Sequence, residues 1–288
     1  MNYLLKATLI AAIVCPAALS SCSKSSSPST PTPPATPANT VRITNNATFG
    51  KVMTDSAGNT LYFFSPDANG QTACTGPCLA AWPSFYTPKV TMDTGLNAAD
   101  FGVIHRPEGT LQTTYKGWPL YYFANDPKAG DVNGDGLENV WFVAKPDYSV
   151  MLAVGAYKGA DSLFYDSTGH SVAAPVATEY FTTDRGVTLY AFSHDTANAN
   201  LFTKSDFSNN AVWPIYEVTG VGKLPSVLSA SNFTTINVFG KTQLTYKGWP
   251  LYNYGGDGGV RGNTAGCSVP TPGAAIWPVV RQFSAPAP

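Results

Sequence analysis

The sequence predicts an all-β fold of two tandem small β domains, each made of two meander-like repeat units. Three observations lead to this prediction. An eight-residue stretch, TYKGWPLY, occurs at residues 114–121 and again, unchanged, at 245–252. A shorter pattern (Tyr, any residue, an aromatic residue, two residues, Asp) occurs four times. Charged residues make up only 12% of the chain while glycine, proline and aromatic residues are plentiful, which suits short strands joined by tight turns.

The beginning of the chain indicates export. A positively charged start followed by an apolar stretch predicts a lipoprotein-type signal peptide at residues 1–21. Residues 19–22, Leu-Ser-Ser-Cys, resemble the bacterial lipobox, and by that resemblance Cys22 is acylated and becomes the new N-terminus. Ser23 stands where many inner-membrane lipoproteins carry Asp, which favours the outer membrane. Ordinary signal cleavage near Ala18 is the alternative.

The rest of the chain divides by composition. Residues 22–39 are almost all Ser, Thr, Pro and Ala, so we expect an extended tether. The formal net charge is −1, which provides no basic field for nucleic acid. Beyond the signal, no apolar run approaches the roughly 20 residues that a spanning helix needs. We therefore expect a cell-envelope protein that contacts the membrane through its N-terminal lipid.

The repeats define the expected domains. The first covers residues 40–145 and the second residues 159–285, and the connection at 146–158 contains a strand-like run, SVMLAVG. Each domain holds two copies of the shorter pattern. The alternative is one closed, four-bladed propeller-like array, because each quarter has enough residues for three or four short strands.

The shorter pattern predicts a strand with an aromatic core face. Its four copies comprise Tyr62, Phe64 and Asp67; Tyr121, Phe123 and Asp126; Tyr190, Phe192 and Asp195; and Tyr252, Tyr254 and Asp257. Residues two apart on a strand share a face, so each copy directs two aromatic rings to the core. The aspartate follows where the strand ends, and we expect it to accept main-chain N–H groups in an Asx-type turn. The alternative is that the four aspartates converge on a ligand or a cation.

The duplicated octapeptide predicts a hairpin corner. Gly117 and Gly248 can adopt the positive φ of a tight turn, and Trp118 and Trp249 precede proline, which favours extended backbone at a sheet edge. We expect Trp118 and Trp249 to fill the core or the hinge; the alternative is that they serve a glycan-active enzyme as stacking platforms.

The chain resembles a bacterial family described as a secreted repeat of unknown function, predicted lipoproteins defined by a Tyr-x-(Phe/Trp/Tyr)-x-x-Asp motif. The first half carries the resemblance in TLYFFSPD, ACTGPCLAAWP, TYKGWPLYYFAND and GDVNGDGLENVW, and the second in TLYAFSHD, VWPIY and TYKGWPLYNYGGD. It covers residues 49–146 and 180–281. The resemblance implies attachment to the envelope and a repeat architecture, and it implies no activity.

Two further stretches could support chemistry. Cys74 and Cys78 have three residues between them in a chain expected to be exported, which predicts a structural disulfide, with a redox or soft-metal pair as the alternative. Cys267 is then left over. Asp131, Asn133 and Asp135 alternate as in a calcium loop. Phe142 occupies the position where such a loop needs its last ligand, so we prefer a turn-rich loop and expect no cofactor, with calcium as the alternative.

No catalytic signature accompanies these features. The first functional hypothesis is therefore a non-catalytic, lipid-anchored envelope protein that binds or scaffolds an envelope protein or a glycan. The second is a redox or metal-handling accessory that uses Cys74 and Cys78 or the Asp131 loop. The third is an enzyme that acts on glycans.

Overall fold

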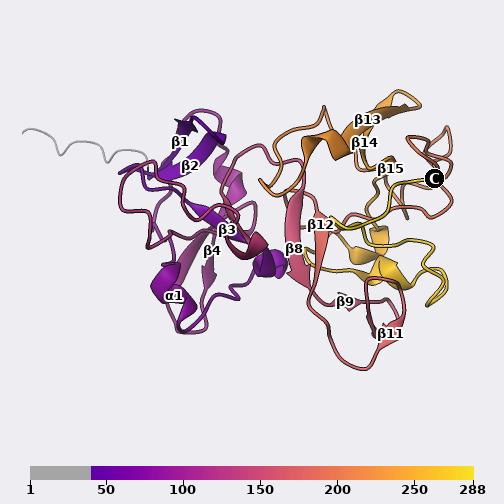
Figure 1. Cartoon of the computed structure of the whole chain (residues 1–288), viewed down its shortest axis with the longest axis horizontal. Helices are drawn as coiled ribbons and strands as arrows, with labels where there is room; N and C mark the ends of the chain where they lie inside the picture. Colours follow the sequence, from indigo (N-terminus) through magenta and orange to yellow (C-terminus); the bar gives the residue numbers. More distant parts are fainter. Residues whose placement is uncertain (1–39) are drawn as a thin grey trace, which may run out of the picture. The chain divides into compact units, whose positions relative to one another are not determined.

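The computed structural model describes residues 40–288; the predicted signal peptide, Cys22 and the tether lie outside the described residues. The described chain is built from short strands and contains little helix (Figure 1), which confirms the all-β prediction. The strands are β1 (Val41–Asn46), β2 (Gly50–Asp55), β3 (Tyr62–Phe64), β4 (Phe101–His105), β5 (Leu111–Tyr115), β6 (Trp118–Pro119), β7 (Trp141–Val143), β8 (Met151–Gly155), β9 (Tyr157–Lys158), β10 (Phe164–Tyr165), β11 (Ser171–Val172), β12 (Thr178–Thr182), β13 (Phe233–Val238), β14 (Lys241–Tyr246) and β15 (Trp249–Pro250). The helices are α1 (Cys78–Ala81) and the 3-10 turns η1 (Ser65–Asn69), η2 (Ala98–Asp100), η3 (Leu137–Asn139), η4 (Ala230–Asn232), η5 (Gly255–Asp257) and η6 (Ala265–Ser268).

The strands form small antiparallel sheets that repeat along the chain. In the first half (residues 40–145) they are β1-β2, β3-β7 and β4-β5-β6, and in the second half (residues 146–288) they are β8-β12, β9-β10-β11 and β13-β14-β15. The hairpin β1-β2 corresponds to β8-β12, and β4-β5-β6 corresponds to β13-β14-β15. Strand β8 lies within the predicted connection, at SVMLAVG, and pairs with β12 from Met151↔Thr182 to Gly155↔Thr178.

The octapeptide forms a hairpin corner in both halves, as predicted. Lys116 and Gly117 have φ of 49° and 79°, and Lys247 and Gly248 have φ of 48° and 88°. Positive φ at both central positions matches the right-handed twist of the flanking strands, and a glycine at the second position adopts it without steric cost. The tryptophan and proline that follow form the short edge strands β6 and β15.

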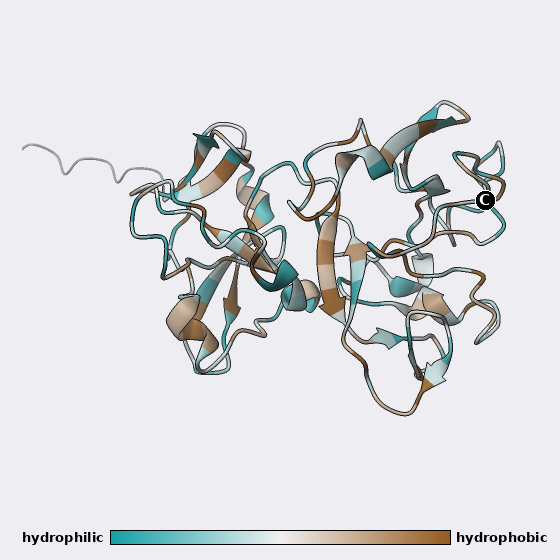
Figure 2. Cartoon of the chain, viewed as in Figure 1, coloured by the Kyte–Doolittle hydropathy of each residue, from teal (hydrophilic) through white to brown (hydrophobic). Residues whose placement is uncertain are grey.

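The core is rich in aromatic side chains, and both strand β8 and the motif residues contribute to it. Strand β8 is hydrophobic along most of its length (Figure 2) and contributes Met151, Leu152 and Ala153 to the buried core. In each motif the first tyrosine is fully buried, as predicted. Phe63 and Ala191, between the two motif aromatics, are also buried, at 3% and 2% exposure. The second aromatic residue of each motif is only partly buried, so the prediction of a single aromatic core face was wrong. Among the described motifs only the first forms a strand, β3, and the tyrosines of the others make isolated β-bridges. None of the described helices has the length and apolarity to cross a membrane.

The second half carries an insertion that the first half lacks. Residues 47–49 connect β1 to β2, whereas residues 156–177 connect the corresponding strands β8 and β12 and contain the β9-β10-β11 sheet. This sheet is attached to the loop that follows the last motif. The Lys158 N–H donates to Thr264 Oγ1 (2.7 Å), and the Ala160 N–H donates to Ser268 Oγ (2.9 Å).

Candidate functional site

Crossed hydrogen bonds join the two motifs of the first half. The Tyr62 hydroxyl donates to Asp126 Oδ2 (2.5 Å), and the Tyr121 hydroxyl donates to Asp67 Oδ2 (2.6 Å). The main chains of Tyr62 and Tyr121 also exchange both N–H···O=C bonds, at 2.9 and 3.1 Å. Each tyrosine therefore satisfies the aspartate of the other motif.

The second half repeats this arrangement, which we call the Tyr–Asp cross. The Tyr190 hydroxyl donates to Asp257 Oδ2, and the Tyr252 hydroxyl donates to Asp195 Oδ2, both at 2.7 Å. The main chains of the two tyrosines exchange hydrogen bonds of 2.8 and 2.9 Å. In both halves the tyrosines are fully buried, so the motif residues pair two repeat units inside the protein.

The other carboxylate oxygen of each motif aspartate holds the loop that follows. Oδ1 accepts a main-chain N–H six to eight residues later, at 2.7–2.9 Å. The donors are Ala73 for Asp67, Asn133 for Asp126, Leu201 for Asp195 and Ala265 for Asp257. The expected main-chain hydrogen bonds are present, although they close loops longer than an Asx turn. The four aspartates are divided between two crosses and do not meet at one ligand site.

Burial changes the proton affinity of these groups. It raises the pKa of Asp67 to about 7 and that of Asp195 to about 6, against hydrogen bonds from Tyr121 and Tyr252 that act in the opposite direction. Burial and the neighbouring Asp195 raise the pKa of Tyr252 well above its ordinary value. The phenols therefore stay protonated and remain donors to the carboxylates.

Each cross is flanked by a stack of four aromatic rings. In the first half the stack runs Phe64, Trp141, Trp82, Phe123, with ring centroids 3.9, 3.7 and 4.4 Å apart. In the second half it runs Phe192, Trp277, Trp213, Tyr254, with centroids 4.6, 3.7 and 4.4 Å apart. The second aromatic residue of each motif is the outer ring of a stack, so the motif also places the two tryptophans.

The candidate calcium loop is held together by its own side chains. Asp131 Oδ2 accepts the Lys128 N–H at 3.0 Å, and Asp135 Oδ1 accepts the Val143 N–H at 2.9 Å. Asn133 donates through Nδ2 to the Asn125 carbonyl at 3.1 Å. Residues 40–288 contain no group of three or more His, Cys, Asp or Glu side chains that could hold a metal ion.

Glycine is required in this loop because the backbone lies directly on the core rings. A Cβ at Gly134 would lie 2.7 Å from Trp82 and 2.9 Å from Tyr62. Gly266, at the same place in the second half, would place a Cβ 2.8 Å from Trp213 and Tyr190. The loop in both halves therefore covers its tyrosine and tryptophan at van der Waals distance.

Cys74 and Cys78 form a disulfide, as predicted. Cys74 is 1% exposed and belongs to the same apolar cluster as Tyr62, Trp82 and Tyr121. Its carbonyl accepts a hydrogen bond from the buried Arg106 guanidinium (2.7 Å). Cys267 is a free, buried thiol whose pKa is raised to about 12 by burial and nearby carboxylates.

The two tryptophans of the octapeptide have different surroundings. Trp118 is 1% exposed, and the guanidinium of Arg261 lies 4.8 Å from its ring centroid. It therefore has no free face on which a glycan could stack. Trp249 is half-buried.

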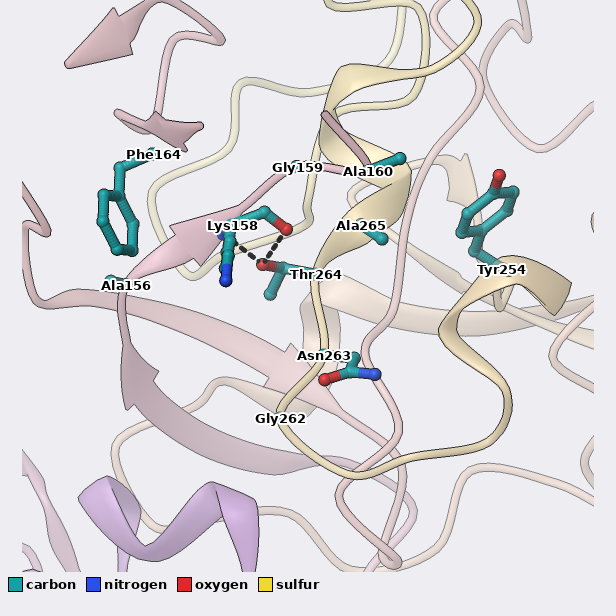
Figure 3. Close-up of a pocket in the computed structure, with 11 residues that line it drawn as sticks. Ala156, Lys158, Gly159, Ala160, Phe164, Tyr254, Gly262, Asn263, Thr264 and Ala265 are labelled. Carbon is teal, nitrogen blue, oxygen red and sulfur yellow. Dashed lines mark hydrogen bonds between the residues drawn. The ribbon is translucent and has the colours of Figure 1, made fainter. Parts of the chain in front are cut away.

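A cleft of about 530 Å³ lies between the insertion and the loop after the last motif. Figure 3 shows Phe164 and Tyr254 at opposite sides of the cleft, with Lys158, Thr264 and Asn263 between them. The remaining lining residues are small: Ala156, Gly159, Ala160, Gly256, Gly262 and Ala265. Tyr254 is the outer ring of the second stack, so the rigid core fixes one wall of the cleft.

The cleft contains polar groups that the described chain leaves without partners. The Tyr254 hydroxyl makes no hydrogen bond to another described residue, whereas the Tyr190 and Tyr252 hydroxyls are both bonded to aspartate. Lys158 lines the cleft as an exposed cation that takes part in none of the ion pairs of residues 40–288. Asn263 donates through Nδ2 to the Asp257 carbonyl at 3.2 Å and leaves Oδ1 unpaired within this part of the chain. The residues that line the cleft therefore include an unpaired hydroxyl, an exposed cation and an unpaired acceptor.

Sequence reasoning did not identify this cleft. The motif residues attracted attention because they recur, whereas Lys158 and Phe164 have no counterpart in the first half. The length difference between residues 47–49 and 156–177 was the available signal, because a long insertion into one copy of a repeat is where new function is commonly added.

Comparison with known proteins identifies the repeats. Residues 44–85 and 102–145 match the model of a family described as a secreted repeat of unknown function. No curated protein and no solved structure matches the chain. The first matched segment contains Tyr62 and the second contains Tyr121 and Asp126, so both copies contribute to the first-half Tyr–Asp cross. These two segments are similar to the family of secreted repeats of unknown function, and both lie in the first half of the chain.

Proposed function

We propose that this protein is a non-catalytic, lipid-anchored protein of the bacterial cell envelope that binds a glycan in the cleft between Phe164 and Tyr254. The observation that supports the proposal is the contrast between the polar groups of the motifs and the polar groups of the cleft. The tyrosines and aspartates of the second Tyr–Asp cross are buried and bonded to each other, whereas the Tyr254 hydroxyl, the Lys158 ammonium and Asn263 Oδ1 in the cleft have no partner among residues 40–288. An insertion into a repeat scaffold has here created a cleft with aromatic walls and polar groups that lack partners. Such a cleft suits a binding protein.

The lining of the cleft suits a sugar ring that bears a carboxylate or another anionic group. Phe164 and Tyr254 offer rings against which the C–H face of a sugar can pack, and the small residues between them allow close approach to the backbone. Lys158 is the charged residue of the lining and would pair with an anion. The lining contains no Asp or Glu, so it lacks the pair of carboxylates that glycoside hydrolysis needs, which favours binding over catalysis.

The anchor is the second part of the proposal. Cys22, in the lipobox-like sequence, would carry the lipid, and residues 22–39 would hold the folded part away from the bilayer. The family description as a secreted repeat and the signal-like start support an envelope location, and Ser23 supports the outer membrane.

Titration with two soluble glycans tests the binding function. Muropeptides carry carboxylates, and a trimer of N-acetylglucosamine is their neutral comparison. We expect muropeptides to bind, and we expect Lys158→Ala and Tyr254→Ala each to weaken binding at least fivefold. Lys204→Ala, an exposed lysine outside the cleft, is the matched control and should bind as the parent does. Equal affinity in all variants would contradict the site, and release of reducing sugar during the titration would indicate an enzyme.

A further inference from the structure

The corner formed by residues 116–118 in the first half holds a segment of the second half. The Lys116 ammonium donates to the Pro146 carbonyl at 2.9 Å and pairs with Asp184 Oδ2 at 2.7 Å. The Trp118 indole N–H donates to the Asp184 carbonyl (2.9 Å). The Lys116 carbonyl in turn accepts a hydrogen bond from Arg261 Nη1 (2.7 Å). Three groups of this corner (an ammonium, an indole N–H and a carbonyl) thus bind the repeat pair that follows.

The same three groups bind a different segment in the second half. The Lys247 ammonium donates to the carbonyls of Gln282 and Ser284, at 3.0 and 3.1 Å. The Trp249 indole N–H donates to the Ala285 carbonyl at 2.8 Å. The Lys247 carbonyl accepts the Ala287 N–H at 2.9 Å. Since most of these contacts are to main-chain atoms, the corner accepts segments of unrelated sequence.

The two occupants do not fill the corner equally. In the first half Asp184 supplies a carboxylate to Lys116, and Arg261 covers Trp118. In the second half the Lys247 ammonium donates to two carbonyls, those of Gln282 and Ser284, and pairs with no carboxylate among the described residues. Trp249 remains half-buried beside a cleft of about 330 Å³ that Phe283, Ser284 and Ala285 also line, and Phe283 is 71% exposed.

The first half offers a turn of the kind that the corner binds. Residues 56–58 align with residues 184–186, since each turn leads into the Thr-Leu-Tyr that begins a motif. Gly58 and Gly186 have φ of 89° and 81°, so the backbone turns alike. Ser56 and Ala57 are exposed, and no backbone N–H of the described chain donates to the Ser56 carbonyl, which corresponds to the bound Asp184 carbonyl.

We infer that residues 283–288 are a displaceable cap on a docking site at residues 247–249, and that the partner for this site is a second copy of the chain, which binds through its turn at residues 56–58. The internal contact between the corner at residues 116–118 and the turn at residues 183–186 is the template for this association. Such a contact is head-to-tail, because it joins different surfaces of the two copies. Each end of the pair then keeps one free surface, to which a further copy can bind. While it is in place, the cap prevents this addition, as terminal caps do in repeat proteins.

Sedimentation velocity of a chain that lacks residues 283–288 tests the inference. We expect its sedimentation coefficient to rise with concentration, and that of the full chain to rise much less. Trp249→Phe in the shortened chain removes the indole N–H and should reverse the association. Ala57→Glu should do the same from the partner's side, while Val176→Glu, at another exposed site, should not.

Near-ultraviolet circular dichroism from the tryptophan stacks verifies that each variant is folded. If removal of the segment unfolds the protein, Ala287→Pro loosens the cap by removing the N–H that bonds to the Lys247 carbonyl. This variant should associate in the same way, though more weakly. Folded, uncapped protein that stays monomeric at all concentrations would overturn the inference, as would association that Trp249→Phe and Ala57→Glu leave unchanged.

Discussion

Replacing Tyr252 with phenylalanine removes the hydroxyl that donates to Asp195 in the second Tyr–Asp cross and that also interacts with the side chains of Gln243 and Thr203. The ring is fully buried against Trp277 and Phe202, and the substitution keeps this packing. The hydroxyl donates to Asp195 Oδ2 at 2.7 Å, and Asp195 is itself 1% exposed, so water cannot easily replace the lost donor. The variant therefore removes the phenol's hydrogen bond to the buried carboxylate while the ring stays in place.

The expected cost follows from the charge of the acceptor. A hydrogen bond to a charged group contributes about 1.5–3 kcal/mol, and the loss of a partner for a buried group costs about as much. The Tyr252 hydroxyl stabilises the ionised form of Asp195, whose pKa is about 6 in the folded chain. Its removal raises that pKa further, so the loss should be larger at pH 8, where the parent carboxylate is ionised, than at pH 4.5, where it is protonated.

Urea unfolding, followed by circular dichroism at both pH values, measures this loss. Tyr254→Phe is the matched control, because it removes a hydroxyl that has no partner within residues 40–288, and it should change the free energy of unfolding by less than about 0.5 kcal/mol. Equal losses for the two variants, or a loss at Tyr252 that does not depend on pH, would refute the role assigned to the cross.

Four further predictions follow from the structure and the sequence. Burial raises the pKa of Asp67 from 3.8 to about 7, so the stability from its protonation is complete below about pH 4 and is lost as the pH rises through about 7; urea midpoints should fall over this range, and Asp67→Asn should flatten the fall. Tyr121→Ala should lower the free energy of unfolding by about 3–5 kcal/mol, and Asn253→Ala much less, because the first leaves a large cavity; equal losses in urea titrations would contradict this difference. Loss of the Cys74–Cys78 disulfide, which closes a loop with a sequence separation of 4, should cost about 2 kcal/mol or less and leave the fold intact, and labelling of both thiols in native protein under a mild glutathione buffer would instead favour a redox role. Cys22→Ser should move the protein from the membrane to the soluble fraction without altering its unfolding, and a variant that still needs detergent for extraction would contradict the lipid anchor.

Local features of the fold could be predicted because they depend on neighbouring residues. The positive φ of Gly117 and Gly248 follows from a tight turn between two short strands, and the disulfide follows from the spacing of two cysteines in an exported chain. The burial of the first motif tyrosine was predicted from alternation along a strand, but alternation does not explain why Phe63 and Ala191, which lie next in the chain, are buried too. Each of these inferences needs only a few consecutive residues.

The Tyr–Asp cross could not be predicted in the same way. Tyr62 and Asp126 are 64 residues apart, and their hydrogen bond depends on the antiparallel bridge between Tyr62 and Tyr121 of two separate motifs. The aspartate gives a local signal only for its main-chain hydrogen bond. The cleft depends on where the β9-β10-β11 insertion contacts the loop after the last motif. The insertion occurs in one half only, so the repeat pattern in the sequence could not predict this contact.

The reciprocal form of the cross has a consequence for how such proteins can evolve. A single motif has a tyrosine that lacks its acceptor and an aspartate that lacks its donor, and both are completed by another copy of the same motif. The motifs therefore complete all of their hydrogen bonds only when they occur in even numbers. A gene that gained or lost one motif would leave a buried carboxylate unpaired, whereas duplication of a pair keeps every group satisfied. An ancestral chain with one motif could have met this parity requirement as a symmetric homodimer, whose two copies were later joined into one polypeptide.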